Sequence, residues 1–339
     1  MEVPVKPIQP SRTAGATQKL LAFASLIVLT VFFSLSSSNF FQFDNIIGIL
    51  LSTAVIGVLA LGSTFVIITG GIDLSVGTVM TFASVMSGVI VTYWHGHVVL
   101  GVVGGLLAGA FCGAISGFAI AKMKIPPFIA TLAMMMITKG LSLVISGAKP
   151  IYFPVNSTDT PITGMTFSDI SMSSILNWII PGFDVPNAIL IFFIVAIVAS
   201  ILLTRTILGR YNFALGSNEE ATRLSGINVN AWKIAIYTLT GVFSGLAGVM
   251  MASRLGSAQP ALGQGYELEA IAAVVIGGTS LSGGTGTILG TVIGALIMSV
   301  LTNGLRILSV PQEWQTVIVG LVVLFAVYAD ILRRRKSKS

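Results

Sequence analysis

Long segments without basic side chains recur along the chain, and they constrain the fold more than any other feature of the sequence. No lysine or arginine occurs between Lys19 and Lys122. Only 9% of the 339 residues are charged and 54% are hydrophobic, whereas a soluble domain has about 25% charged residues. Because so few charges cannot cover the water-facing surface of a soluble protein of this length, the chain must fold largely in lipid.

Apolar stretches that suit membrane-spanning helices occur about ten times, since a span needs about 20 mostly apolar residues. The predicted spans are residues 20–37, 46–69, 74–93, 97–121, 126–146, 187–204, 233–252, 268–279, 286–304 and 314–330, of which the eighth is short. The sequence therefore predicts an all-α integral membrane protein. It has one transmembrane domain over residues 19–332, between a tail of residues 1–18 and a basic tail of residues 333–339.

The basic residues favour one orientation of these spans. With both ends in the cytoplasm, ten spans place 14 of the 18 basic residues on the inner side. Only Lys149, Arg254 and Arg306 then lie outside, and Lys139 lies within a span. Because basic residues concentrate in cytoplasmic loops, we expect both termini in the cytoplasm.

The longest polar interval on the predicted outer face is residues 147–186, which contains five prolines. In a compact membrane protein such a long loop is either disordered or a contact surface. We favour a contact surface.

A weak internal repeat relates two glycine-rich segments, each at a point where an apolar stretch breaks. Residues 70–78 and 277–285 share six of nine positions at an offset of 207, although the shared residues are mostly Gly, Ser and Thr. Broken helices in transporters line a central path, where freed backbone groups meet water or substrate. Small residues also serve close helix packing, and the sequence leaves both interpretations open.

Several kinds of chemistry are excluded by what the sequence lacks. The basic residues form no stripe with interleaved aromatic residues, as a nucleic-acid surface would. No G-x-x-x-x-G-K-[ST] motif is present to bind a nucleotide phosphate. The single Cys112 permits neither an internal disulfide nor a zinc set, and His95 and His97 lack Cys or carboxylate neighbours for a metal. We expect no metal site, no cofactor in this chain and no enzyme activity from it alone.

A short polar segment between the sixth and seventh predicted spans carries helix signals at both ends. Ser217 with Glu220 three residues later forms a capping box, and Gly226 suits the left-handed residue just past a helix end. Glu219 and Glu220 complement the dipole in the first turn. Because an isolated helix of about two turns is marginal in water, we expect the helix over residues 217–226 to dock against a partner. A plain surface connector is the alternative.

Three separated motifs occur in sequence. They are Gly71-Ile72-Asp73-Leu74-Ser75-Val76-Gly77, the stretch from Gly216 to Asn230, and the run from Leu255 through Gly265-Tyr266-Glu267-Leu268-Glu269 to Ser280. Together they resemble the membrane permeases of bacterial ABC importers for monosaccharides of the ribose, galactose and xylose type. The resemblance extends from about residue 40 to the C-terminus.

This resemblance implies an inner-membrane homodimer, a cytoplasmic ABC ATPase that binds ATP and Mg²⁺, and a periplasmic sugar-binding protein. It also implies that the capped helix is the coupling helix, which enters a cleft of the ATPase. The implied coupling residues are Ser217, Glu219, Glu220, Ala221, Arg223 and Gly226.

Further candidates follow from the chemistry of a neutral sugar, which is held by hydrogen bonds and aromatic faces. The path or gate candidates are Asp73, Phe128, Gln259, Tyr266 and Asn303. Ionisable groups near spans are often functional, but Asp73 equally suits a helix cap. Glu267 and Glu269 are expected at the outer surface, where docking of the binding protein and simple solvation are equal alternatives. We expect Lys139 to snorkel or to pair within the bundle rather than to contact substrate.

Two functions from different classes are compatible with these features. The first is the permease subunit of an ATP-driven ABC importer that translocates a ribose-like pentose or a hexose. The second is an ion-coupled secondary transporter of a small polar solute. A secondary transporter usually needs intramembrane acid or base groups, and it has no reason to keep a capped cytoplasmic helix. We therefore favour the importer permease.

Overall fold

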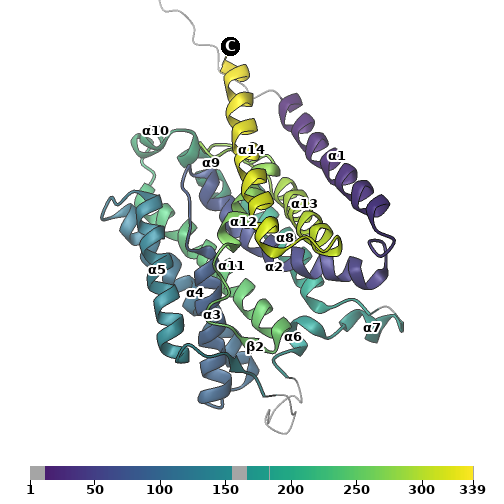
Figure 1. Ribbon diagram of the computed structural model, residues 1–339. Helices are drawn as coiled ribbons and strands as arrows, with labels where there is room; N and C mark the ends of the chain where they lie inside the picture. Colours follow the sequence, from purple (N-terminus) through teal and green to yellow (C-terminus); the bar gives the residue numbers. More distant parts are fainter. Residues whose placement is uncertain (1–11, 155–165, 183, 339) are drawn as a thin grey trace, which may run out of the picture.

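The computed structural model describes residues 12–154, 166–182 and 184–338, with side chains for residues 20–154, 166–182 and 184–332. The protein is a bundle of helices, most of which run between the two ends of the molecule (Figure 1). The elements are α1 (Arg12–Ser36), α2 (Phe43–Ile68), α3 (Val76–Gly88), the π-helical turn η1 (Val89–Tyr93), α4 (Val98–Ala121), α5 (Pro127–Ser146), β1 (Ile151–Tyr152), α6 (Asp169–Met172), α7 (Ile175–Ile179), α8 (Asn187–Arg205), α9 (Ile207–Ser217), α10 (Glu219–Leu224), α11 (Val229–Leu255), β2 (Ser257–Ala258), α12 (Tyr266–Ile276), α13 (Ile288–Ile307) and α14 (Gln312–Lys338).

Eight helices of the described chain are long and apolar enough to cross a membrane. They are α2, α3 with η1, α4, α5, α8, α11, α13 and the first 21 residues of α14. Two predicted spans fall short, because the apolar part of α1 is Leu20–Ser36 and α12 has only 11 residues. The all-α membrane fold is therefore confirmed, whereas the count of ten spans is not.

The first and last helices extend into the predicted tails. Helix α1 begins at Arg12, inside the predicted tail of residues 1–18, and α14 continues to Lys338 through the predicted basic tail. Residues 1–11 and 339 lie outside the described residues.

Helices α4 and α11 share the most extensive helix contact of the described chain. Glycines recur at every fourth position of α4, at residues 101, 105, 109, 113 and 117, so they lie along one face of the helix. A side-chain carbon added at Gly109 would collide with the backbone of Gly241 and Gly245 in α11. Small residues let membrane helices approach closely, and here they set the distance between the two helices.

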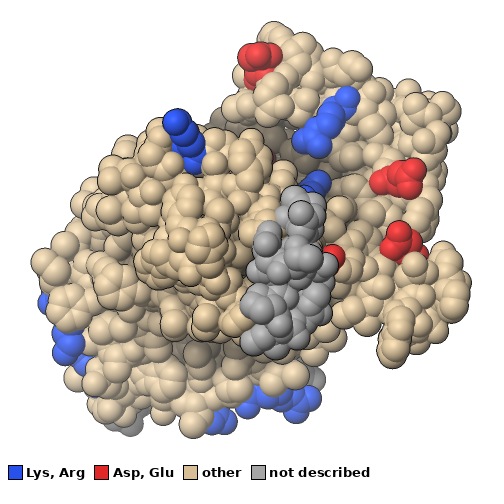
Figure 2. Space-filling view, turned by 90° about the horizontal axis from the view of Figure 1, so that it is seen from below, with Lys and Arg blue, Asp and Glu red and all other residues tan. Residues whose placement is uncertain are grey.

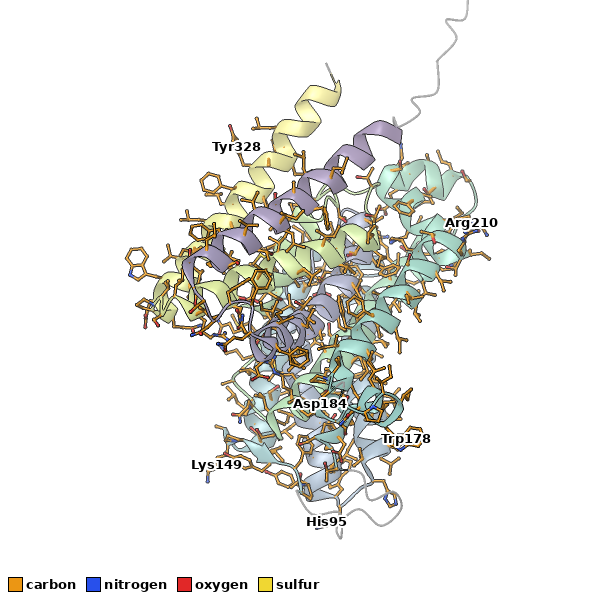
Figure 3. All side chains as sticks on the ribbon, turned by 90° about the vertical axis from the view of Figure 1, so that its right-hand side faces the viewer. His95, Lys149, Trp178, Asp184, Arg210 and Tyr328 are labelled. Atoms are coloured by element: carbon orange, nitrogen blue, oxygen red, sulfur yellow. The ribbon has the colours of Figure 1, made fainter. Side chains whose placement is uncertain are left out.

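The two ends of the molecule carry different elements. Helix α10, the start of α1 and the end of α14 lie at one end, which we call the α10 end (Figure 1). His95 and Lys149 lie at the opposite end, called the His95 end (Figure 3). Seen from the His95 end, the surface is mostly uncharged, with isolated acidic and basic side chains (Figure 2).

The described part of the predicted outer loop, residues 147–186, is folded against α11. Strand β1 pairs antiparallel with β2, with Ile151 opposite Ala258. The Ser171 N–H donates to Ser253 Oγ of α11 at 2.9 Å. This part of the loop therefore caps the His95 end, while residues 155–165 and 183 lie outside the described residues.

Candidate functional site

Helix α10 is the short capped helix that the sequence predicts, but its N-cap is a different residue. The Oδ1 atom of Asn218 accepts a hydrogen bond from the Ala221 N–H at 2.9 Å. Ser217 is instead the last residue of α9, so the predicted capping box of Ser217 with Glu220 is wrong. Because α9 continues through Ser217, the first non-helical residue is Asn218, which is an equally good cap.

The other predicted features of α10 are in place. Gly226 has a φ of +82°, a left-handed conformation that favours glycine just past a helix end. Arg223 forms ion pairs with Glu219 at 3.2 Å and with Glu220 at 3.3 Å. Leu224, at the end of the helix, is 81% exposed. The helix therefore presents ordered charges beside an exposed apolar side chain.

An ion pair holds α10 against α11, and a ring contact holds α11 against α9. Lys233 of α11 donates to Glu219 at 2.6 Å. The rings of Tyr211 in α9 and Trp232 in α11 meet edge to face, with centroids 4.9 Å apart. A displacement of α10 must therefore involve the ends of α9 and α11.

Gly216 of α9, two residues before the α10 cap, packs against the last residue of α2 and against the second glycine-rich segment of the internal repeat. A side-chain carbon added there would collide with the carbonyl oxygen of Ile68 and lie 2.5 Å from the Gly284 nitrogen. The Gly284 N–H itself donates to the Ile68 carbonyl at 2.8 Å. We call this contact among Ile68, Gly216 and Gly284 the glycine junction, and it connects the end of α9, just before α10, to the end of α2 and to the loop after α12.

The two helix breaks, which are the turns just after α2 and just after α12, have the same backbone conformation. Gly70 after α2 and Gly278 after α12 have φ values of +80° and +97°. In both turns the N–H of this glycine donates to the carbonyl oxygen three residues earlier, and the N–H of the following residue donates to the carbonyl oxygen five residues earlier. These are the two hydrogen bonds of a Schellman motif. The two turns are 208 residues apart, so they lie one residue out of register with the sequence match, which has an offset of 207.

The chain re-enters the molecule between β2 and α12. Ala258 lies beside Gly88 of α3, whereas Gly263 packs on Gly77, eleven residues earlier in α3. Eleven helical residues correspond to about 16 Å, so the segment of residues 259–265 descends along α3 to its first turn. Non-helical backbone at this depth is tolerated because it is enclosed by protein. Helix α12 is short because it covers only the remaining depth.

Asp73 and Glu267 lie near the first turns of α3 and α12. Asp73 is buried, and its Oδ1 accepts from the Ser75 N–H at 2.8 Å and from Ser75 Oγ at 2.6 Å. Glu267 is also buried, and its carboxylate accepts from the Gly265 N–H at 3.1 Å. The structure thus places Asp73 in a turn before α3, and it places Glu267 inside the molecule rather than at the predicted outer surface.

Four of the remaining candidates lie in the re-entrant segment, α12 and α13, and the fifth lies in α5. Gln259 donates to Ser257 Oγ at 2.9 Å in the re-entrant segment, and Tyr266 follows at the start of α12. Asn303 lies on α13, and its Oδ1 finds no hydrogen-bond partner among the described residues. Glu269 of α12 is half-buried and interacts electrostatically with Arg306 of α13. Phe128 lies apart, exposed in the first turn of α5.

Lys139 pairs within the bundle, one of the two roles that the sequence predicts for it, but the sequence does not predict its partner. Lys139 Nζ of α5 donates to Gln264 Oε1 of the re-entrant segment at 2.9 Å. The only sequence signal is Lys139 itself, an intramembrane cation that needs a partner. Its partner lies 125 residues further along the chain, so local sequence patterns do not predict which residue pairs with Lys139.

Comparison with known proteins identifies the family. The model of the family described as branched-chain amino acid transport system / permease component matches residues 45–327. The chain belongs to this family. As a permease component it is a transport subunit rather than an enzyme, in agreement with its apolar helices.

Curated relatives of this permease component are similar over nearly the whole chain. The ribose import permease protein RbsC of Escherichia coli (strain K12) is 43% identical over 308 residues, which cover 90% of this chain and 91% of the relative. RbsC of Bacillus subtilis (strain 168) is 42% identical, with 95% of each chain covered. The xylose transport system permease protein XylH of Escherichia coli (strain K12) is 31% identical, with 94% and 93% covered. No solved structure matches significantly.

Proposed function

We propose that the chain is the membrane permease subunit of an ATP-driven ABC importer and that it translocates a monosaccharide, a ribose-like pentose or a hexose. The sugar class is supported by relatives named for ribose and xylose import over nearly full length. The subunit acts as a homodimer in the bacterial inner membrane, with both termini in the cytoplasm. Its partners are a cytoplasmic ABC ATPase, which binds ATP and Mg²⁺, and a periplasmic sugar-binding protein.

The observation that carries the proposal is the attachment of α10, through the end of α9, to the helix breaks. Glu219, Glu220 and Arg223 give α10 an ordered, charged and accessible surface for the ATPase. The glycine junction then joins the end of α9, just before α10, to the end of α2 and to the loop after α12. Closure of the ATPase dimer therefore moves α10 as a rigid body, and this motion reaches the segments that lead into α3 and α13.

The remaining candidates take their proposed roles from their positions. Gln259, Tyr266 and Asn303 contact the sugar on its way from the His95 end, and Asp73 orders the entry to α3. Phe128 lines the inner part of the path. Glu269, two residues beyond Glu267 in α12, lies too deep for the predicted docking role, and Glu267 holds the start of α12 from inside.

Reconstitution with purified partners tests the function. The chain is placed in liposomes with its partner ATPase, and uptake of radiolabelled ribose and xylose is measured with the loaded binding protein outside. We expect uptake that requires ATP inside and persists when ionophores collapse all ion gradients. Uptake driven by an ion gradient without the ATPase would instead identify a secondary transporter.

A further inference from the structure

Lys139 and Gln264 form their hydrogen bond partway along α5, on the accessible surface of the single chain. Lys139 is twelve residues from the start of α5 and seven from its end, which places it about 18 Å and about 10 Å from the two ends of the helix. Gln264 follows Gly263, which packs on the first turn of α3. The pair therefore lies at the level of the hydrocarbon core, far from the headgroups on either side.

Both side chains remain accessible at this depth. Gln264 is exposed and Lys139 is half-buried. A charged group that faces lipid at this level is costly, so accessible polar groups here must face water, substrate or another protein chain. Exposure in the single chain thus indicates a polar surface inside the assembled transporter.

The exposed apolar residues of α5 are centred to one side of Lys139. They include Ile137 and Leu141, and Lys139 is two residues from each, about 200° around the helix. Phe128, eleven residues before Lys139, is on the same side as Lys139, because eleven residues complete about three turns. Met136, three residues before Lys139, is also exposed, so Lys139 lies at the edge of the apolar side of α5, next to the contact of α5 with α3.

Direct contacts with α3 hold both members of the pair. Thr138, next to Lys139, donates to Thr78 Oγ1 of α3 at 2.8 Å. Gly263, next to Gln264, packs against Gly77 and Thr81 of α3. Helix α3 follows the break that touches the glycine junction, so a displacement of α10 reaches both sides of the Lys139–Gln264 contact.

We propose that Lys139 and Gln264 form the polar constriction through which the neutral polyol passes, and that each contacts its hydroxyl groups when the pair opens. The inference rests on the proposed function and deepens it. The ammonium group of Lys139 supplies three donors, and the amide of Gln264 supplies both donors and an acceptor, which matches hydroxyls that donate and accept. In the closed state the two side chains satisfy one another, so neither leaves an unpaired polar group in the membrane.

Transport assays separate this role from the overall function. In the reconstituted system, Lys139→Met and Gln264→Leu keep side-chain size but remove the hydrogen-bonding groups. We expect each to lower sugar uptake by about tenfold or more, while ATPase stimulation by the binding protein persists. Lys149→Met, at the His95 end, is the matched control and retains uptake. Uptake at the unchanged level in both variants would overturn the constriction, whereas absence of ATP-driven uptake in the unchanged chain would overturn the proposed function instead.

Cysteine accessibility tests the exposure directly. In a Cys112→Ala background, Gln264→Cys is treated with a membrane-impermeant, positively charged thiosulfonate, and Ile137→Cys serves as the lipid-facing control. We expect the thiol of the Gln264→Cys variant to react with the reagent during turnover, and we expect saturating sugar to slow this reaction. The Ile137→Cys variant should remain unreactive. If the thiol introduced at position 264 stays unreactive throughout the cycle, or Lys139→Met dissociates the dimer in detergent, the pair is an interface contact and the proposal fails.

Discussion

Lys233 Nζ of α11 lies 2.6 Å from Oε2 of Glu219 in α10. The ion pair joins the short capped helix to the second turn of the helix that packs along α4. It lies between the proposed ATPase-facing surface and the glycine-lined contact of α4 with α11. A force applied to α10 is therefore transmitted to α11 as well as to the glycine junction.

Lys233→Met is expected to lower ATP-driven uptake more than it lowers stability. The two side chains are 19% and 39% exposed, and ion pairs that are partly screened by solvent contribute about 1 kcal/mol or less. The thermal unfolding midpoint in detergent should thus change little, while uptake per ATP hydrolysed falls. Lys233→Arg retains the charge and serves as the control. Unchanged coupling in Lys233→Met would show that this ion pair does not transmit the motion.

Exchange of the charges on α10 tests whether its surface recognises a partner. The double variant Glu220→Lys with Arg223→Glu preserves an opposite-charge pair three residues apart but turns the Arg223–Glu219 ion pair into two like charges, which destabilises the helix by only about 0.2–0.5 kcal/mol. It reverses the charges that are offered to the ATPase. We expect membrane insertion at the normal level and loss of sugar-stimulated ATP hydrolysis. Undiminished stimulation would argue that α10 is only a surface connector.

The glycine junction gives a third prediction. Gly216→Ala places a carbon against the Ile68 carbonyl and the Gly284 nitrogen, so the end of α9 must shift away from the end of α2 and from the loop after α12. We expect transport to be lost even where the protein inserts and dimerises. Gly226→Ala is the comparison, because nothing lies within 4 Å of an added carbon there and only the left-handed φ is strained, at about 1–2 kcal/mol. Measurement of uptake and ATPase coupling in both variants distinguishes the effect of the steric clash at position 216 from the effect of backbone strain at position 226.

Packing between α4 and α11 gives a fourth prediction. Gly109→Ala adds a carbon against the backbone of Gly241 and Gly245, and overpacking of this kind costs about 1–3 kcal/mol. The unfolding midpoint in detergent should fall clearly. Gly140→Ala in α5 meets nothing within 4 Å and should leave the midpoint nearly unchanged. Equal midpoints for the two variants would mean that the α4–α11 contact relaxes freely.

Much of the fold follows from the sequence because hydropathy reports burial in lipid directly. Hydropathy predicts the long helices, and local turn chemistry predicts the end of α10 at Gly226. The sequence does not place the N-cap correctly, because Ser217 and Asn218 are adjacent and both suit the position. Only the length of α9, set by its packing, decides between them.

The candidate site is less predictable because its geometry depends on contacts far apart in sequence. The sequence predicts Glu267 at the outer surface, yet Gly263 and Gly77, 186 positions apart, bring the re-entrant segment down along α3. The partner of Lys139 depends on the same packing. The hydropathy pattern predicts a short apolar stretch at α12. It does not predict that the extended backbone of residues 259–265 spans the rest of the membrane depth.

Orientation in the membrane gives the last prediction, for which the structure supplies two matched positions. Trp178 on α7 is 88% exposed at the His95 end, and Leu224 on α10 is 81% exposed at the opposite end. In a Cys112→Ala background, Trp178→Cys and Leu224→Cys are therefore about equally accessible to a membrane-impermeant maleimide, and only sidedness distinguishes them. With 14 of the 18 basic residues assigned to the α10 side, the positive-inside rule requires that the Trp178→Cys variant reacts in right-side-out vesicles and the Leu224→Cys variant only in inside-out vesicles. The reverse pattern would place α10 outside the cell, away from any cytoplasmic ATPase, and would contradict both the topology and the proposed coupling role.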